Sequence, residues 1–259
     1  MIGSIEDRSA LQPWWSCEDF WEDMFDFIFP PETLAYGEEV AVRSAALLGV
    51  APPARIVDLG CGPGRVAVPI ARMGFRVVGI DVQSGYLARA RTRAEREGVV
   101  VELVRGDVSY LDVDAAFDGA LSLFTSFGYL ASRADDERLL ARVRRALRPG
   151  ARFVLETAHR DGVVRLLSER VREAPDGRRW REDPSFDLRA GVVEATWTLT
   201  SGARTRHFTT RLRAYTAGEL VSMLDLAGFR DVRLLGSLDG GRPSLDSYTV
   251  VAVGTRPAS

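Results

Sequence analysis

Lysine is missing from this chain of 259 residues, so all 34 basic side chains are arginines. With 36 acidic residues the formal net charge is −2. The arginines are scattered among the acids and do not gather in one basic stretch. A protein that binds a nucleic-acid backbone needs such a positive patch. We therefore expect no nucleic-acid partner.

Cysteine is scarce as well. Cys17 and Cys61 are the only two, which is too few for the disulfide framework of a small secreted protein. The first residues lack the charged and then apolar pattern of a signal peptide. No apolar run approaches the roughly 20 residues of a membrane-spanning helix. The sequence thus predicts a cytoplasmic protein with no membrane partner.

From Arg55 onward, short apolar runs alternate with amphipathic helical stretches, which is typical of a parallel sheet with helices on both faces. Hydrophobic residues make up 46% of the chain, enough for a sizeable core. Ser84 is expected to cap a helix that ends near Gly98. Five strands are predicted, at 56–59, 76–81, 100–105, 117–123 and 152–157.

The alternation of strand and helix stops after the fifth predicted strand. Residues 178–214 hold two or three strand-like stretches without a helix between them, and Ser201-Gly202 is expected to form a hairpin turn. We interpret this part as an antiparallel insertion over the end of the sheet. A helix at 217–227 and two strands, at 232–235 and 248–253, complete the prediction.

The stretch VDLGCGPGR, residues 57–65, places three glycines at every second position between a strand and a helix. Backbone amides at such a turn bind anions. Arg65 replaces the third glycine of the dinucleotide fingerprint, and Asp58 precedes the first glycine by two residues. A pyrophosphate is repelled by a nearby carboxylate. An amino-acid tail needs amides for its carboxylate and an acid for its ammonium, which favours S-adenosylmethionine over NAD.

Two further acids follow the next two predicted strands. Asp81 ends the second strand, where a carboxylate can accept both hydroxyls of a ribose. Asp107 follows the third strand, where it can accept from an adenine amino group while Val108 packs on the ring. A turn cap is the alternative role for Asp107. Acids at the ends of three successive strands together indicate a nucleoside site.

The stretches VDLGCGPGR, VVGIDVQ, RGDV, FDGALSLFTSFGYL and LRPGARFVLET resemble the class I S-adenosylmethionine-dependent methyltransferases over residues 55–157, and the C-terminal elements resemble them more loosely. The resemblance implies an α/β, Rossmann-like, seven-stranded and mostly parallel sheet whose last strand is antiparallel. The loop SFGYL and the insertion are similar to small-molecule methyltransferases of bacterial secondary metabolism, including sugar N-methyltransferases.

On this resemblance we divide the chain into four parts. They are an N-terminal aromatic-rich helical lid (1–50), an S-adenosylmethionine-binding core (51–160), an antiparallel insertion that caps the substrate (161–215), and a C-terminal helix with the last two strands (216–259).

The resemblance also implies a function and a set of cofactor-binding residues. The cofactor is S-adenosyl-L-methionine, its product is S-adenosyl-L-homocysteine, and the methyl acceptor is an N or O nucleophile of a small molecule. The expected cofactor-binding residues are Asp58, Gly60, Cys61, Gly62, Gly64, Asp81, Val82, Gln83, Asp107, Val108, Leu123 and Phe124. The alternatives are a protein that binds this cofactor without transferring methyl groups, and an NAD-dependent oxidoreductase, which Asp58 and Arg65 disfavour.

Methyl transfer is a displacement at an already activated carbon, so the protein supplies mainly alignment and exclusion of water. Tyr129, in the loop after the fourth strand, is the first catalytic candidate, to orient the acceptor or relay its proton. Packing on the next helix is the alternative. His159, two residues past the fifth strand, is a candidate base, or else a solvated loop histidine. No metal-binding constellation is found.

Eight large aromatic residues stand between positions 14 and 36. This density suits a lid over a partly apolar substrate. The alternative is packing on the sheet edge or on a second subunit, which would make a homodimer. The expected substrate residues are Trp14, Trp15, Phe20, Trp21, Tyr36, Phe127, His207 and Arg211.

Overall fold

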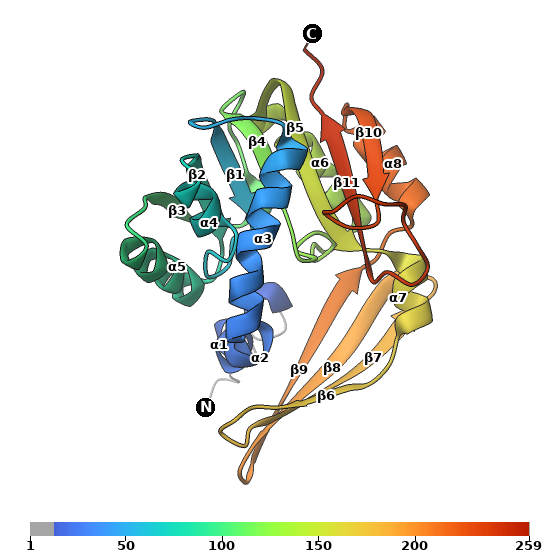
Figure 1. Cartoon of the computed structure of the whole chain (residues 1–259). Coiled ribbons are helices and arrows are strands. Elements are labelled where there is room, and N and C mark those ends of the chain that lie inside the picture. Colours follow the sequence, from blue (N-terminus) through green and yellow to red (C-terminus); the bar gives the residue numbers. More distant parts are fainter. Residues whose placement is uncertain (1–12, 259) are drawn as a thin grey trace, which may run out of the picture.

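The computed structural model describes residues 13–258, which form two β-sheets and the helices that pack on them (Figure 1). The larger sheet has seven strands in the order β10-β11-β5-β4-β1-β2-β3. Strand β11 lies antiparallel to both β5 and β10, and the remaining neighbours are parallel. The predicted seven-stranded, mostly parallel sheet is therefore confirmed. Its strands are β1 (Arg55–Leu59), β2 (Arg76–Asp81), β3 (Val101–Arg105), β4 (Phe117–Ser122), β5 (Leu147–Ala158), β10 (Arg230–Leu235) and β11 (Thr249–Thr255).

Helices cover both faces of this sheet because neighbouring residues of a buried strand point to opposite sides. Val57 of β1 and Phe153 of β5 pack toward α6 and α8, whereas Ile56 and Val154 pack toward α3 and α4. The helices are α1 (Glu18–Asp23), α2 (Phe25–Ile28), α3 (Pro31–Leu48), α4 (Ala67–Arg72), α5 (Ser84–Arg96), α6 (Arg133–Ala146), α7 (Arg160–Leu166) and α8 (Ala217–Leu226).

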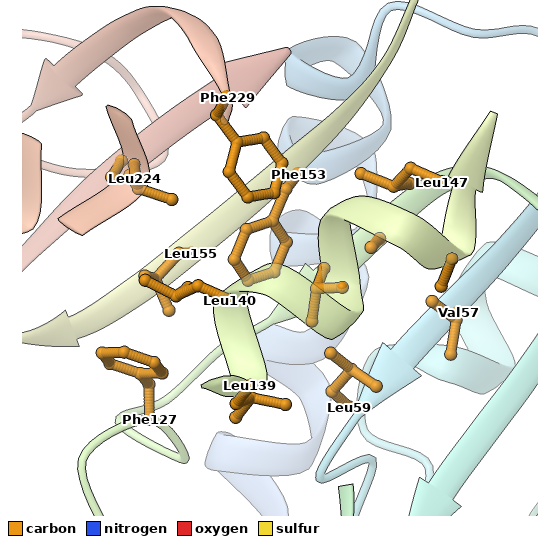
Figure 2. Close-up of a cluster of buried hydrophobic side chains, with 14 of the residues drawn as sticks. Val57, Leu59, Phe127, Leu139, Leu140, Leu147, Phe153, Leu155, Leu224 and Phe229 are labelled. Atoms are coloured by element: carbon orange, nitrogen blue, oxygen red, sulfur yellow. The ribbon is translucent and has the colours of Figure 1, made fainter. Parts of the chain in front are cut away.

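The core on the α6 side joins segments that are far apart in the sequence (Figure 2). The ring of Phe153 stacks on Phe229, with 5.9 Å between the ring centroids. Leu140 of α6 and Leu224 of α8 are fully buried in the same cluster. The C-terminal helix and strands therefore belong to the main core.

Most predicted element boundaries lie within two residues of the observed ones, and two of the differences have a clear physical cause. Gln83, not Ser84, precedes the first turn of α5, and its amide donates to the side chain of Asp81. Strand β5 begins at Leu147, before Pro149-Gly150, because Leu147 already pairs with Phe117 of β4.

The smaller sheet is antiparallel and has four strands in sequence order: β6 (Arg170–Glu173), β7 (Arg179–Asp187), β8 (Val192–Ser201) and β9 (Arg204–Arg213). The prediction of two or three strands over 178–214 missed β6, whose four residues are all exposed and show no apolar alternation. The predicted hairpin turn is present, since Ser201 pairs with Arg204 across Gly202.

The smaller sheet is attached at the carboxyl ends of the parallel strands (Figure 1). The Arg213 amide at the end of β9 donates to the Gly128 carbonyl in the loop after β4, at 2.8 Å. Two residues later, the Tyr215 hydroxyl donates to the buried Asp136 carboxylate of α6, at 2.6 Å. The insertion thus overhangs the edge where α/β proteins bind their ligands.

The turn between β1 and α4 that holds the three glycines, residues 60–65, is called the glycine loop. Helix α3 crosses directly over this loop at Gly37. A Cβ atom at this position would collide with the backbone carbonyl of Arg65. Neither backbone can give way at low cost, because α3 is also packed on the sheet through Val40 and Leu48. Gly37 therefore sets the distance between α3 and the glycine loop.

We predict that Gly37→Ala destabilises the protein by about 1–3 kcal/mol, the range for overpacking in a close-packed interior. This loss outweighs the gain of about 1 kcal/mol that alanine brings to a helix interior. Gly218→Ala is the matched control, because the same change in α8 meets open space. Chemical denaturation measures both. If Gly37→Ala and Gly218→Ala are equally stable, α3 is not in tight contact with the glycine loop at Gly37.

Candidate active site

A cavity of about 610 Å³ lies at the carboxyl ends of β1 to β4, within the usual size range of small-molecule sites. One wall is the glycine loop with the ends of β2 and β3. The opposite walls are the N-terminal segment, which we define as residues 13–29, and the inner face of the smaller sheet.

Nearly all the predicted cofactor-binding residues line this cavity. They are Asp58, Gly60, Cys61, Gly62, Asp81, Val82, Gln83, Asp107, Val108, Leu123 and Phe124. Gly64 does not line it. This residue has φ +76°, and a Cβ there would lie 2.9 Å from Val68 of α4 and 3.1 Å from Ala90 of α5. Gly64 thus allows close packing of the two helices.

Asp81 holds the glycine loop in place. Its Oδ2 accepts from the Gly62 amide at 2.8 Å, and its Oδ1 accepts from the Gln83 amide at 2.9 Å. Gly60 and Gly62 have φ +74° and +54°, a left-handed conformation that favours glycine. Burial raises the pKa of Asp81, and the backbone hydrogen bonds oppose that rise.

Asp58 is 4% exposed and lies beside Asp81 in the cavity wall. Burial and the neighbouring carboxylate raise the pKa of Asp58 to about 7, while the nearby Arg65 works in the opposite direction. Asp58 therefore changes its charge close to neutral pH. Asp107 lines the cavity and also accepts from the Ser109 amide at 2.8 Å, so it caps a turn as well.

Arg65 brings a positive charge to the same end of the cavity. Its guanidinium lies over the Phe124 ring, 3.1 Å from the centroid. Burial lowers the pKa of Arg65 to about 10, and the Glu156 and Asp58 carboxylates oppose the shift. The guanidinium thus stays charged at neutral pH. This end of the cavity offers charges of both signs, which fits an amino-acid tail.

The N-terminal segment closes the cavity from the side of α5. Gln83 Nε2 donates to the Trp15 carbonyl at 2.7 Å, and the Tyr86 hydroxyl donates to the Trp21 carbonyl at 2.8 Å. On the other side, Trp14 Nε1 donates to the Arg211 carbonyl of β9 at 2.9 Å. The segment therefore bridges the core and the smaller sheet.

Five of the predicted substrate residues line the cavity, namely Trp14, Trp15, Phe20, Trp21 and Phe127. Tyr36 does not, because it lies on an exposed face of α3 with 44% of its surface accessible.

The predictions for His207 and Arg211 are wrong. Both lie on the outer face of β9, where His207 contacts Thr198 and Arg211 pairs with Glu194 at 3.1 Å. The inner face presents Thr210 and Leu212 to the cavity. The reason is strand alternation: the mostly apolar face turns inward and the polar face toward solvent.

The two catalytic candidates lie in different places. Tyr129 lines the cavity, and its ring meets Trp14 edge-on at 4.5 Å between centroids. Burial raises the pKa of Tyr129 to about 12, so it stays protonated at neutral pH. His159 is buried at the start of α7 and is not among the lining residues of the described chain. The prediction that His159 reaches the pocket is therefore wrong, because the chain turns into α7 there.

Residues 56–150 match the family model described as "Methyltransferase domain". The solved CcbJ methyltransferase from Streptomyces caelestis is 28% identical, with a TM-score of 0.76, and the alignment covers 86% of this chain and 90% of that one. Residues 56–150 of this chain therefore contain a methyltransferase domain.

Curated relatives share shorter stretches with this methyltransferase domain. A ubiquinone biosynthesis O-methyltransferase from Paramagnetospirillum magneticum is 34% identical over 113 residues, which cover 44% of each chain. An S-adenosyl-L-methionine-dependent Diels-Alderase from Talaromyces variabilis is 33% identical over 111 residues, 41% of this chain and 37% of that protein. The chain thus spans less than half the length of these two relatives.

The cavity is lined by further residues that the sequence predictions did not include. Glu156 lies near the end of β5, where its Oε2 accepts from the Phe124 amide at 3.0 Å. The sequence could have indicated this residue, because Glu156 is an acid within the apolar run FVLET, residues 153–157. Others come from the smaller sheet and from the residue just before β11, where no sequence motif marked them: Arg170, Arg172, Trp180, Glu182, Trp197 and Tyr248.

Residues 13–258, which the structure describes, contain no group of three or more His, Cys, Asp or Glu side chains that could hold a metal ion. None of their helices is long and apolar enough to cross a membrane.

The pKa of Asp58 leads to a pH-dependent prediction for cofactor binding. If its carboxylate binds the ammonium of S-adenosylmethionine, affinity must rise from pH 6 to pH 7.5 as Asp58 ionises, by up to about tenfold per pH unit below its pKa. Asp58→Asn should bind more weakly and lose this dependence. Exposed Asp114 provides the control, Asp114→Asn. Calorimetry that gives the same pH slope for Asp58→Asn and wild type would remove Asp58 from the ammonium site.

Proposed function

We propose that this protein transfers the methyl group of S-adenosylmethionine to an amine or hydroxyl group of a small, partly apolar molecule, in bacterial secondary metabolism. One observation carries the proposal. A single cavity contains the strand-end carboxylates Asp58, Asp81 and Asp107 at one side and an aromatic surface from the smaller sheet and the N-terminal segment at the other.

The cofactor side fits each part of S-adenosylmethionine. Asp58 and Arg65 offer opposite charges to its amino-acid tail, together with the amides of the glycine loop. Asp81 accepts from the ribose hydroxyls, and Asp107 accepts from the adenine amino group while Val108 packs on the ring. These roles follow from the order of the strand ends across the sheet.

When bound, S-adenosylmethionine would supply a methyl group on a sulfonium, whose carbon bonds to the acceptor lone pair as the C–S bond breaks and S-adenosylhomocysteine leaves. The residues of this chain then need to orient that lone pair and exclude water. Tyr129 stays protonated at neutral pH, so it orients the acceptor by hydrogen bonding and does not act as the base. The acceptor loses its proton to water or to the cavity carboxylate Glu156.

A second candidate function is S-adenosylmethionine-dependent catalysis without methyl transfer, since one relative is named a Diels-Alderase. We favour methyl transfer because the likeness to the CcbJ methyltransferase extends over 90% of that chain, whereas the alignment with the Diels-Alderase covers 37% of its length.

A transfer assay separates the two candidates. Incubation with S-adenosylmethionine and a panel of amines, phenols and sugars should give S-adenosylhomocysteine in equal amount to a methylated product, both read by mass spectrometry. With that acceptor, Tyr129→Phe should lower kcat about three- to tenfold, the effect of one hydrogen bond, and leave cofactor affinity unchanged. Exposed Tyr110 provides the control, Tyr110→Phe. Cofactor binding without S-adenosylhomocysteine from the whole panel would favour the second candidate.

The N-terminal segment is, in this proposal, the lid that keeps water from the reacting groups. Its contacts support that role, because its hydrogen bonds to Gln83 and Tyr86 reach the wall that receives the cofactor. We predict that hydrogen exchange in residues 14–36 slows when S-adenosylmethionine binds. Helix α8, remote from the cavity, serves as the internal reference. Equal, strong protection of 14–36 in both states would make the segment a permanent part of the core.

A further inference from the structure

The inner face of the smaller sheet contains a row of side chains that differ from the apolar residues around them. Across the strands, Arg170 of β6 lies opposite Glu182 of β7, and Glu182 lies opposite Trp197 of β8. Trp180, two residues before Glu182, points to the same face, and its ring lies 4.9 Å from that of Trp197. All four residues line the cavity.

Three buried polar atoms in this group have no hydrogen-bond partner in the described chain: Trp180 Nε1, Trp197 Nε1 and Glu182 Oε2. Leaving such groups unpaired destabilises a fold, so buried polar atoms are nearly always satisfied. Glu182 is 8% exposed. Three orphan atoms on one cavity wall indicate a surface that is completed by a ligand.

The hydrogen-bonding capacity of these three atoms indicates which chemical group of a ligand can pair with them. Glu182 needs a donor, and the two indole N–H groups need acceptors. An ammonium group donates but has no lone pair to accept with, whereas a hydroxyl group does both. The charge of Glu182 also does not require a cation, because Arg170 Nη1 lies 3.7 Å from Glu182 Oε2.

The cavity wall around Glu182 also contains aromatic side chains. The Trp180 and Trp197 rings lie against Phe20 and Phe27 of the N-terminal segment, with Phe20 at 5.2 Å from Trp197 and Phe27 at 6.4 Å from Trp180. Phe20, Phe27 and Trp180 are buried in one cluster with Trp197 packed against it, and the part of this cluster that lines the cavity offers apolar surface to a ring. None of these residues belongs to the glycine loop or to the ends of β2 and β3, which form the cofactor side of the cavity.

We propose that Trp180, Glu182 and Trp197 form a recognition subsite for a hydroxyl-bearing ring of the methyl acceptor, with Glu182 accepting from a hydroxyl group and the indoles donating to ring oxygens. The proposal rests on the proposed function, since it describes the acceptor of that reaction. The determinants of acceptor specificity then lie in the inserted sheet and not in the cofactor-binding core.

The test measures binding by ligand-observed NMR on the full chain saturated with S-adenosylhomocysteine. The probes are trans-1,4-cyclohexanediol and trans-1,4-diaminocyclohexane, which share a ring and differ in hydroxyl against ammonium at neutral pH. We expect the diol to bind at least threefold more tightly than the diamine. Glu182→Leu, which removes the acceptor oxygens, and Trp197→Phe, which keeps a ring and removes the N–H, should each weaken diol binding about three- to tenfold.

Glu194→Gln is the matched control, because Glu194 lies on the outer face of the same sheet and pairs with Arg211. It should leave diol binding unchanged. The thermal midpoints of Glu182→Leu and Trp197→Phe show whether each variant is folded. If Glu182→Leu does not fold, Trp197→Phe carries the test alone.

Tighter binding of the diamine, no measurable binding of the diol to wild type, or equal diol binding by wild type and Trp197→Phe would each overturn the subsite. None of these results depends on catalysis. Failure of the proposed function appears instead as absence of S-adenosylhomocysteine in the transfer assay, so the two failures are distinguishable.

Discussion

The site depends on the two hydrogen bonds that the Asp81 carboxylate accepts, from Gly62 in the glycine loop and from Gln83 at the start of α5. They fix the loop after β1 relative to the end of β2, so that Asp58 lies next to a second carboxylate. Burial and, to a smaller extent, this neighbour raise the pKa of Asp58 to about 7. The loop can accept this position because Gly60 and Gly62 adopt the left-handed conformation. The charged end of the cavity is therefore a consequence of backbone geometry.

The smaller sheet completes the cavity through its own alternation. Its outer face carries ion pairs such as Arg211 with Glu194, while the part of its inner face that lines the cavity is apolar except for Arg170, Arg172, Glu182 and Thr210. A sheet that overhangs the strand ends and buries one face must present every second residue to the site. Because of this alternation, His207 and Arg211 lie on the outer face, whereas Trp180, Glu182 and Trp197 line the cavity.

The N-terminal segment joins the two parts. It bonds through Trp15 and Trp21 to residues of the cofactor wall and through Trp14 to β9, and it packs Phe20 on the inner face of the smaller sheet. Such contacts bridge up to 197 positions in sequence, as between Trp14 and Arg211. A segment with these partners on both sides is coupled to any movement of the insertion relative to the core.

The sequence alone determined the parallel core and its cofactor wall, because both depend on local patterns. Strand periodicity, the glycine spacing at 60–64 and the acids that end successive strands act within a few residues of one another, and parallel strand order brings their ends together. Eleven of the twelve expected cofactor-binding residues therefore line the cavity. Only the tertiary structure decided the wall that the smaller sheet contributes to the cavity. Whether His159 faces a pocket or starts α7, and which face of β9 turns inward, depends on how the insertion packs. Glu182 and Trp197 are 15 positions apart and meet only through strand register, which no local pattern specifies.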